Sequence, residues 1–289
     1  MQFSKQIVEI HPPKGKIVQY KDKSIFILED FQGPGTLGTK LRKAKGLLEE
    51  LKTSHYKKVS MFGSRNSNFL AAFSLFFKLN GFSISTFTYS HSSYRGGNSI
   101  LTEHFSDSID HFSSKNDLLV SPEYQKHKNS PDCFSINEFG IHKGSLNGLR
   151  SLWKHPVFEK FKTIVLDVGS GLTYLSALEF FGSRKKIIGI SLGLGIPKMN
   201  AYLKEQELNL SLNVNREYEL ISPAIAKSYN SKSKTLSQFI GEMGEKGVFL
   251  EPMYSGKSLY TIFHSFHKSE MNEVLYLHQG GLISVVGDL

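Results

Sequence analysis

The sequence is poor in cysteine, with Cys133 as the single example in 289 residues. One cysteine cannot form an intramolecular disulfide, and it cannot supply a cysteine-based zinc site. No apolar run approaches the length of a membrane-spanning helix, and the N-terminal residues 1–6 lack the apolar stretch of a secretory signal. These absences predict a soluble, cytoplasmic protein without a membrane partner. Cys133 itself lies in a strand-like stretch and is interpreted as a small buried hydrophobe.

Clustered basic charge is also missing, although the formal net charge is +9. The lysines and arginines are spread along the chain without a basic run or an arginine-rich arm, so we predict no nucleic-acid partner. A scattered positive charge is compatible with an anionic cofactor or substrate. His264 and His267 lie three apart on a predicted helix without a carboxylate partner at helical spacing. We interpret them as surface histidines and predict no metal site.

Short apolar strands alternate with amphipathic helices through most of the chain, which is 39% hydrophobic. This alternation is typical of an α/β fold with mostly parallel sheets. We place a small domain at 45–157, inserted into a large domain that comprises 1–44 and 158–289. The predicted strands are 24–28, 58–62, 82–86, 118–120, 163–168, 187–191 and 274–277. The predicted helices are 37–53, 67–80, 97–112, 142–155, 172–182, 196–208, 234–246 and 257–267.

Lys40 has the clearest chemical interpretation in this sequence. It begins a predicted helix after a strand and the glycine-rich turn 32–35, beside small residues that let a ligand approach. A lysine in this position can form a Schiff base if its surroundings lower its pKa, because only the neutral amine reacts. For Lys40 alone, a solvated lysine on a basic helix face is the more common explanation. Three further motifs reverse that preference.

The first motif, residues 167–173, follows a predicted strand and opens a predicted helix. Its glycines let backbone N–H groups converge on an anion, and Ser170 and Thr173 add hydroxyl donors. This suits a phosphate, although a tight strand-to-helix turn would use the same glycines for geometry alone. The motif matches neither the GxGxxG dinucleotide fingerprint nor a phosphate-binding loop with its lysine.

The second motif, residues 62–69, also joins a predicted strand to a predicted helix. Ser67 and Asn68 either cap that helix or face a ligand. The third motif, residues 250–258, is interpreted as a strand end, a turn and a helix start. It places Tyr254 and Ser255 where open α/β sheets bind ligands, or else forms a capped helix with a packed tyrosine. A glycine turn at 278–281 follows the last predicted strand.

In their order and spacing, these segments resemble the family of 1-aminocyclopropane-1-carboxylate deaminase and D-cysteine desulfhydrase. These are pyridoxal-phosphate enzymes with the tryptophan synthase β-like fold, also called fold type II. The resemblance runs from about Ile25 to Gly287. The family patterns Gly-Gly-Asn-Lys-x-Arg-Lys, Gln-Ser-Asn-His, Gly-Ser-Gly-Gly-Thr, Asp-Pro-Val-Tyr-Thr-Gly-Lys and His-Thr-Gly-Gly correspond in order to residues 37–43, 66–69, 169–173, 251–257 and 278–281.

The resemblance implies two domains, each a three-layer αβα unit, and a homodimer. It implies that Lys40 carries pyridoxal 5'-phosphate as a Schiff base and later acts as acid and base. Ser67 would contact the substrate carboxylate or move a proton, and Tyr254 would be a catalytic residue. Asn68 would meet the phenolic oxygen of the cofactor, and Ser255 its pyridine nitrogen. The cofactor phosphate would be held by Lys43 and by the loop of Gly169, Ser170, Gly171, Leu172 and Thr173.

Four departures from the family pattern limit what the resemblance implies. Thr39 replaces an asparagine, Phe69 a histidine and Leu172 a glycine. Ile225 stands where the family has an active-site tyrosine, and Tyr229 is the nearest tyrosine that could reach the same space. Since ring-opening deamination uses that tyrosine, Ile225 bears more on the substrate than on the cofactor.

The sequence therefore predicts a pyridoxal-phosphate enzyme that eliminates or deaminates a small amino acid, as D-cysteine desulfhydrase or 1-aminocyclopropane-1-carboxylate deaminase does. The main alternative is a degenerate family member that binds the cofactor or an amino acid with little turnover. A phosphate-binding α/β protein unrelated to pyridoxal phosphate would explain residues 169–173 but leave Lys40 and Ser255 without roles.

Overall fold

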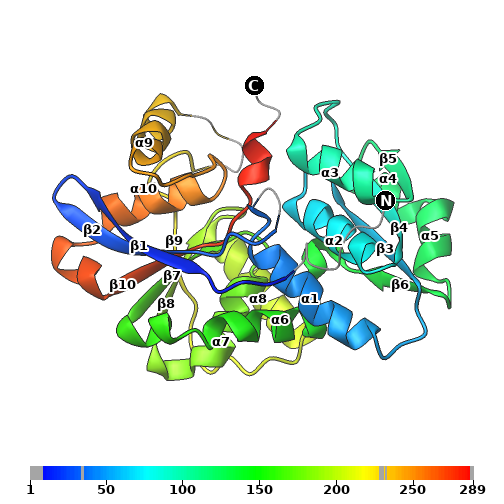
Figure 1. The fold of residues 1–289 in the computed structure, drawn as a ribbon, viewed down its shortest axis with the longest axis horizontal. Coiled ribbons are helices and arrows are strands. Elements are labelled where there is room, and N and C mark those ends of the chain that lie inside the picture. Colours follow the sequence, from blue (N-terminus) through cyan, green and yellow to red (C-terminus); the bar gives the residue numbers. More distant parts are fainter. Residues whose placement is uncertain (1–8, 34–35, 228–230, 232, 287–289) are drawn as a thin grey trace. The chain divides into compact units, whose positions relative to one another are not determined.

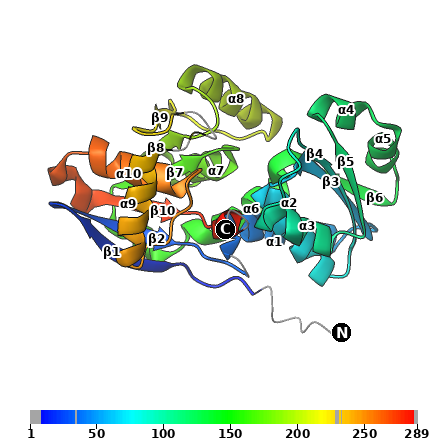
Figure 2. The same ribbon diagram turned by 90° about the horizontal axis from the view of Figure 1, so that it is seen from above.

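The structure is a computed structural model that describes residues 9–33, 36–227, 231 and 233–286. Its described residues group into two compact units, whose ribbons are drawn in Figures 1 and 2. Unit 1 is drawn from the segments 1–11, 32–149 and 281–289, and unit 2 from the segments 12–31 and 150–280. Neither unit contains a helix long and apolar enough to cross a membrane within these described ranges.

Unit 2 is built on a six-stranded sheet in the order β1-β2-β10-β7-β8-β9. All neighbouring strands are parallel except β1 and β2, which form an antiparallel hairpin at one edge. The parallel strands read as nearly continuous apolar runs because both faces of the sheet are covered. The strands are β1 (Lys14–Tyr20), β2 (Lys23–Glu29), β7 (Thr163–Val168), β8 (Lys186–Ser191), β9 (Glu219–Ile221) and β10 (Val274–His278).

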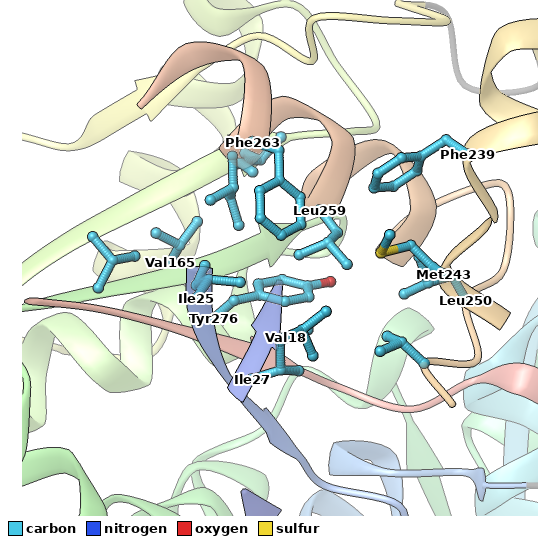
Figure 3. Close-up of a cluster of buried hydrophobic side chains, with 14 of the residues drawn as sticks. Val18, Ile25, Ile27, Val165, Phe239, Met243, Leu250, Leu259, Phe263 and Tyr276 are labelled. Atoms are coloured by element: carbon cyan, nitrogen blue, oxygen red, sulfur yellow. The ribbon is translucent and has the colours of Figure 1, made fainter. Parts of the chain in front are cut away.

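Helices cover both faces of the unit 2 sheet. On one face, α9 (Lys234–Glu245) and α10 (Ser255–Ser265) bury the hydrophobic cluster around Tyr276 that Figure 3 shows. On the other face, α7 (Leu172–Phe181) and α8 (Ile196–Asn209) bury a second cluster, which includes Trp153 at the end of α6 (Lys143–Trp153). Figure 1 shows α10 and α7 on opposite sides of the strands. Unit 2 is therefore a three-layer αβα unit.

Unit 1 is a second three-layer unit, on a fully parallel sheet in the order β5-β4-β3-β6. The strands are β3 (Lys58–Ser64), β4 (Ser83–Tyr89), β5 (Ser108–Phe112) and β6 (Cys133–Ile136). One face is covered by α1 (Thr39–Leu51) and α2 (Asn68–Leu79), with α3 (Gly97–Phe105) packed against α2. The other face carries α4 (Lys115–Val120) and α5 (Pro122–Lys128), as Figure 2 shows. The predicted mostly parallel sheets and the three-layer units are confirmed.

The two units differ from the predicted domains at four segments: 1–11, 32–44 and 281–289 group with unit 1, and 150–157 groups with unit 2. Helix α1 is one continuous helix whose apolar face, including Leu41, Ala44 and Leu48, lies in the core of unit 1, so the chain is not divided at residue 44. The segment 150–157 groups with unit 2 because Leu152 and Trp153 are buried in its core. The assignment of the cofactor to the large domain stays a prediction.

Three local predictions were wrong. Residues 118–120 are helical, because Ser114 caps α4 by accepting from the N–H of Asp117 at 3.2 Å and the short helix buries Leu118. The predicted helix 97–112 ends at Phe105, and its second half is the strand β5. The stretch that leads to Leu250 is not a strand, so the third motif starts from a loop.

Candidate active site

Lys40 lies in the first turn of α1 and is half-buried. The helix is started by Gly38, whose φ of 61° suits a residue without a side chain, and the N–H of Leu41 donates to the Gly38 carbonyl at 3.0 Å. Leu37 and Leu41 flank this turn and are both buried in the core of unit 1. The apolar neighbours fix the orientation of the turn, while Lys40 keeps part of its surface open.

Lys43, one turn further along α1, is only 2% exposed. Burial holds the pKa of its ammonium group well below the ordinary value, and the charge of Lys40 adds to this effect. Within the described part of the chain, no carboxylate forms an ion pair with Lys43. A bound anion would supply the missing counter-charge, so this side chain is suited to an anionic ligand.

The loop before Lys40 is bound to the C-terminal glycine turn, which in turn lies against Asn68. The carbonyl of Thr36 accepts from the N–H of Gly281, and its hydroxyl accepts from the N–H of Leu282 at 3.0 Å. A Cβ added to Gly281 would lie 3.0 Å from the Asn68 amide nitrogen, so only glycine allows this approach. The loop before Lys40, the second motif and the C-terminal glycine turn thus meet in unit 1.

Asn68 has a buried side-chain oxygen that finds no hydrogen-bond partner among the described residues, and the same is true of the Thr39 hydroxyl. A buried polar atom without a partner is costly, and a ligand is one common explanation. Both atoms belong to residues beside Lys40 or the Gly281 turn. They therefore fit a polar ligand at this point of unit 1.

Ser67 is the N-cap of α2, and its hydroxyl accepts from the N–H of Phe69 at 3.2 Å. The capping interpretation of this serine is thus supported, although a hydroxyl that accepts can still donate its own proton. Phe69 is 3% exposed and packs edge-on against Phe73, with ring centroids 4.6 Å apart. The aromatic replacement at position 69 is therefore used by the core of unit 1.

In unit 2, the loop 169–173 joins β7 to α7 as predicted. Gly171 is the N-cap of α7 with φ of 76°, and the free N–H groups of the first helical turn follow it. A Cβ added to Gly169 would lie 3.0 Å from the ring of Tyr254, so the tyrosine packs directly on this glycine. Leu172 and Thr173 are buried, with exposures of 1% and 3%. Ser170, in the same loop, is half-buried.

Ser255 begins α10 and is 1% exposed. Its hydroxyl accepts from the N–H of Glu251 at 2.9 Å and lies 3.2 Å from the Glu251 carboxylate. That carboxylate also accepts from the N–H groups of Met253, Tyr254 and Ser255 at 2.6–2.8 Å. Burial raises the pKa of Glu251, and these hydrogen bonds oppose the rise. The Glu251 carboxylate thus binds the backbone where α10 begins, and it engages the Ser255 hydroxyl within the protein.

A polar contact that sequence reasoning missed joins β7 and β10 at their carboxyl ends. The Tyr276 hydroxyl donates to the Asp167 carboxylate at 3.1 Å, and the Gln279 side chain donates to the Asp167 carbonyl at 2.9 Å. Burial, followed by the Asp167 charge, raises the pKa of Tyr276 well above its ordinary value. The order of the sheet changes direction between these strands, which is where open α/β sheets bind ligands. The one sequence signal was Asp167, a polar residue near the end of an apolar strand.

Ile225 is half-buried and packs against the hydrophobic cluster under α9 and α10. The preceding residue, Ala224, donates its N–H to the Thr261 hydroxyl at 2.9 Å, which fixes this segment on α10. Tyr229, the alternative tyrosine, lies outside the described residues, as do Pro34 and Gly35 of the turn before Lys40. Among the residues that the structure describes, no group of three or more His, Cys, Asp or Glu could hold a metal ion.

Comparisons with known proteins bear on this arrangement. The chain is 28% identical over 132 residues to a curated Pyrococcus horikoshii protein named "Putative 1-aminocyclopropane-1-carboxylate deaminase". That match covers 43% of this chain and 40% of the relative, so the chain spans well under half the length of the curated relative that it matches. No family model matches the chain.

Similarity to solved structures extends over nearly the whole chain. A structure described as a homologue of 1-aminocyclopropane-1-carboxylate deaminase has a TM-score of 0.77 at 23% identity, over 96% of this chain and 92% of that chain. O-acetylserine-dependent cystathionine β-synthase from Helicobacter pylori has a TM-score of 0.69 at 13% identity, over 100% and 97%. At these identities, the likeness establishes the fold.

The predicted fold class is thereby confirmed as the tryptophan synthase β-like, type II fold of pyridoxal-phosphate enzymes. The curated relative and the solved homologue also confirm the resemblance that the five motifs predicted. The chain is thus a relative of proteins named for 1-aminocyclopropane-1-carboxylate deaminase, and it has their fold.

Proposed function

We propose that this protein is a pyridoxal-phosphate enzyme that acts on a small amino acid. The observation that carries the proposal is the meeting of the Lys40 turn, Asn68 and Gly281 at one point of unit 1. These segments are far apart in the sequence, and the resemblance had assigned two of them to the cofactor independently. The fold and the relatives named above support the same cofactor.

The residues of each unit fit parts of this cofactor. In unit 1, Lys40 offers a half-buried amine, and the unpartnered Asn68 oxygen offers a polar contact. The buried Lys43 ammonium has no carboxylate partner among the described residues, which suits a phosphate. In unit 2, the Gly169–Gly171 turn leaves N–H groups at the start of α7 open for an anion.

Each residue then has a defined task. Lys40 would hold the cofactor through its amine, and its Nζ would hold or move a proton beside the substrate. The bound cofactor supplies an electron sink for the substrate α-carbon. Ser67 presents a hydroxyl that orients the substrate carboxylate, while the Tyr254 ring packs over Gly169 and keeps water from that loop.

Ser255 fits its expected contact with the pyridine nitrogen less well. The hydroxyl is 1% exposed and is engaged by Glu251, so a direct contact requires its proton to turn away from that carboxylate. We therefore assign the role of Ser255 to the start of α10, where it positions the neighbouring Tyr254.

We propose elimination with release of ammonia as the reaction, as in D-cysteine desulfhydrase or 1-aminocyclopropane-1-carboxylate deaminase. A second candidate function, binding of the cofactor or an amino acid with little turnover, is favoured by one observation. Ile225 occupies the position expected for a catalytic tyrosine, and its side chain packs on a hydrophobic cluster. A panel of D- and L-cysteine, serine and 1-aminocyclopropane-1-carboxylate separates the two functions by ammonia release.

We further propose a cytoplasmic homodimer. The buried, unpaired thiol of Cys133 is consistent with a reducing compartment. Light scattering of the purified protein at several concentrations tests the dimer, since a mass near 32.5 kDa at every concentration would contradict it.

The test of the cofactor is the visible absorption spectrum of the protein supplied with pyridoxal phosphate, before and after borohydride. We expect a band in the wild type that borohydride abolishes and that Lys40→Ala lacks. Lys45→Ala is the matched control, because Lys45 is an exposed lysine of the same helix. A wild type without the band, or a Lys40→Ala protein that keeps it, would refute the assignment.

A further inference from the structure

Phe139 has an unusual backbone conformation for an aromatic residue. It follows β6 in a short turn, residues 138–140, with φ of 64° and ψ of 5°. This is the left-handed region, which bulky side chains avoid because Cβ approaches the backbone. Such strain persists only where the surroundings enforce it, and it is frequent at ligand-binding sites.

The surroundings of Phe139 hold the turn on both sides. Before it, the buried carboxylate of Glu138 accepts from the Tyr89 hydroxyl and from the Lys115 ammonium, each at 2.6 Å. After it, Gly140 has φ of 67° and lies against Phe73, whose ring would be 2.6 Å from an added Cβ. The two neighbours of Phe139 are thus buried and fixed, while Phe139 itself is 37% exposed.

The position of this turn in unit 1 is where a ligand is expected. β4 and β5 extend the sheet on one side of β3, whereas β6 joins it on the other side, so the order of the strands reverses between β3 and β6. Ligands of open α/β sheets bind at the carboxyl ends of the strands at such a reversal. The 138–140 turn follows β6 there and lies against β3 and α2, the two elements that flank Ser67 and Asn68.

Other non-glycine residues with positive φ clarify why Phe139 is notable. Among the described residues, Lys21 is in the β1–β2 hairpin and Ser211 ends α8, two places where tight turns need this conformation. Thr36 precedes Lys40 and Ala226 follows Ile225, so both lie in segments that the sequence linked to the active site. Phe139 is the aromatic member of the set, and neither a hairpin nor the end of a long helix requires it there.

We propose that Phe139 is a specificity-determining residue that lines the amino-acid site of unit 1 and favours substrates with an apolar side chain. Its exposed ring would contact the substrate side chain, while Ser67 and Asn68 meet the polar end. A substrate hydroxyl against this ring would lose hydration without gaining a partner, whereas a methyl or ring CH₂ group would not. This inference rests on the proposed amino-acid substrate and specifies its class.

The test compares D-alanine with D-serine, which differ by one hydroxyl. Their dissociation constants are measured by calorimetry on the wild type, Phe139→Gly and Phe139→Asn, each supplied with pyridoxal phosphate and checked for the borohydride-sensitive band. Glycine and asparagine both tolerate the left-handed conformation, so neither variant adds strain. Lys21→Gly is the matched control, since it relieves a left-handed residue in unit 2.

We expect the wild type to bind D-alanine more tightly, and the preference to fall about tenfold in both Phe139 variants and to be unchanged in Lys21→Gly. The melting temperature of Phe139→Gly should be equal to or above that of the wild type, because strain is relieved. An unchanged preference in variants that keep the band would overturn the inference and leave the proposed function standing. A lower melting temperature with an unchanged preference would make Phe139 a structural residue. A wild type without the band would refute the proposed function, and this inference with it.

Discussion

The contact between α1 and α6 gives the sharpest prediction about stability, because it depends on glycine at three positions. A Cβ added to Gly148 would lie 1.9 Å from the Arg42 carbonyl oxygen, and one added to Gly46 would lie 2.2 Å from the Gly144 carbonyl oxygen. The two backbones therefore touch, without side chains between them. The atoms in the way are main-chain atoms, which cannot turn aside as a flexible side chain can.

The expected effect of Gly148→Ala follows from these distances. Ordinary contact begins near 3.4 Å, so the helices must separate by about 1.5 Å. Overpacking of this kind costs about 3 kcal/mol, and alanine in a helix interior returns about 1 kcal/mol relative to glycine. We expect a net loss of about 2 kcal/mol, which lowers the melting temperature by about 4 °C or more.

Gly241→Ala is the matched control for this substitution. Gly241 lies in α9, is exposed, and has nothing within 4 Å of an added Cβ. The same chemical change should therefore stabilise the protein by up to about 1 kcal/mol, through helix propensity alone. The two variants are predicted to shift the melting temperature in opposite directions.

The assay is thermal unfolding followed by circular dichroism, with a urea titration as a second measurement. The same variants also report on the site, because α1 carries Lys40 and Lys43. Separation of α1 from α6 should weaken cofactor binding in Gly148→Ala but not in Gly241→Ala. If Gly148→Ala were as stable as Gly241→Ala, the close contact of the two helices, and the argument from it, would be wrong.

Two further predictions concern buried residues of the two units. Phe239, in the cluster of Figure 3, packs edge-on against Tyr20 with ring centroids 5.1 Å apart. Phe239→Ala should therefore lower the free energy of unfolding, measured by urea titration, by about 3–5 kcal/mol. A decrease under about 1 kcal/mol would contradict the packing described. Burial holds the pKa of Lys43 in the folded protein well below the ordinary lysine value. The unfolded chain therefore binds more protons, and the free energy of unfolding falls as the pH drops from the ordinary lysine pKa through the lowered pKa. Lys43→Met should therefore be more stable than the wild-type apoprotein near neutral pH and lose less stability between pH 9 and pH 7, whereas parallel urea midpoints at both pH values would refute this.

Much of the fold could be predicted because it depends on local patterns. Continuous apolar runs such as 163–168 mark strands that are covered on both faces, and helical spacing of apolar residues marked α1, α2 and α7. The failures were also local. An apolar triplet at 118–120 suited a strand or a helix, and the Ser114 cap decided for the helix. The predicted helix 97–112 ran on into β5, whose five residues gave too short a pattern to be separated from it.

For the site, the sequence identified residues but not their surroundings. The five motifs sufficed for the family resemblance, since residue type, order and spacing are properties of the chain alone. The burial of individual side chains could not be predicted. Leu172 and Phe69, two departures from the family pattern, are both buried, and Phe69 packs in the core of unit 1. Glu251 and Tyr276 were missed as partners of Ser255 and Asp167, because these contacts require particular directions of side chains.

By itself, the sequence determined the class of fold and the alternation of strands and helices, because these follow from composition and periodicity. It identified the candidate lysine through the order and spacing of motifs and the resemblance that they carry. Only the tertiary structure brought Thr36, Asn68 and Gly281 together and buried Lys43 without a carboxylate partner in the described chain. It alone placed Phe139 in a left-handed turn beside β3. Burial, backbone dihedral angles and contacts between distant segments arise only when the chain packs, so no local pattern encodes them.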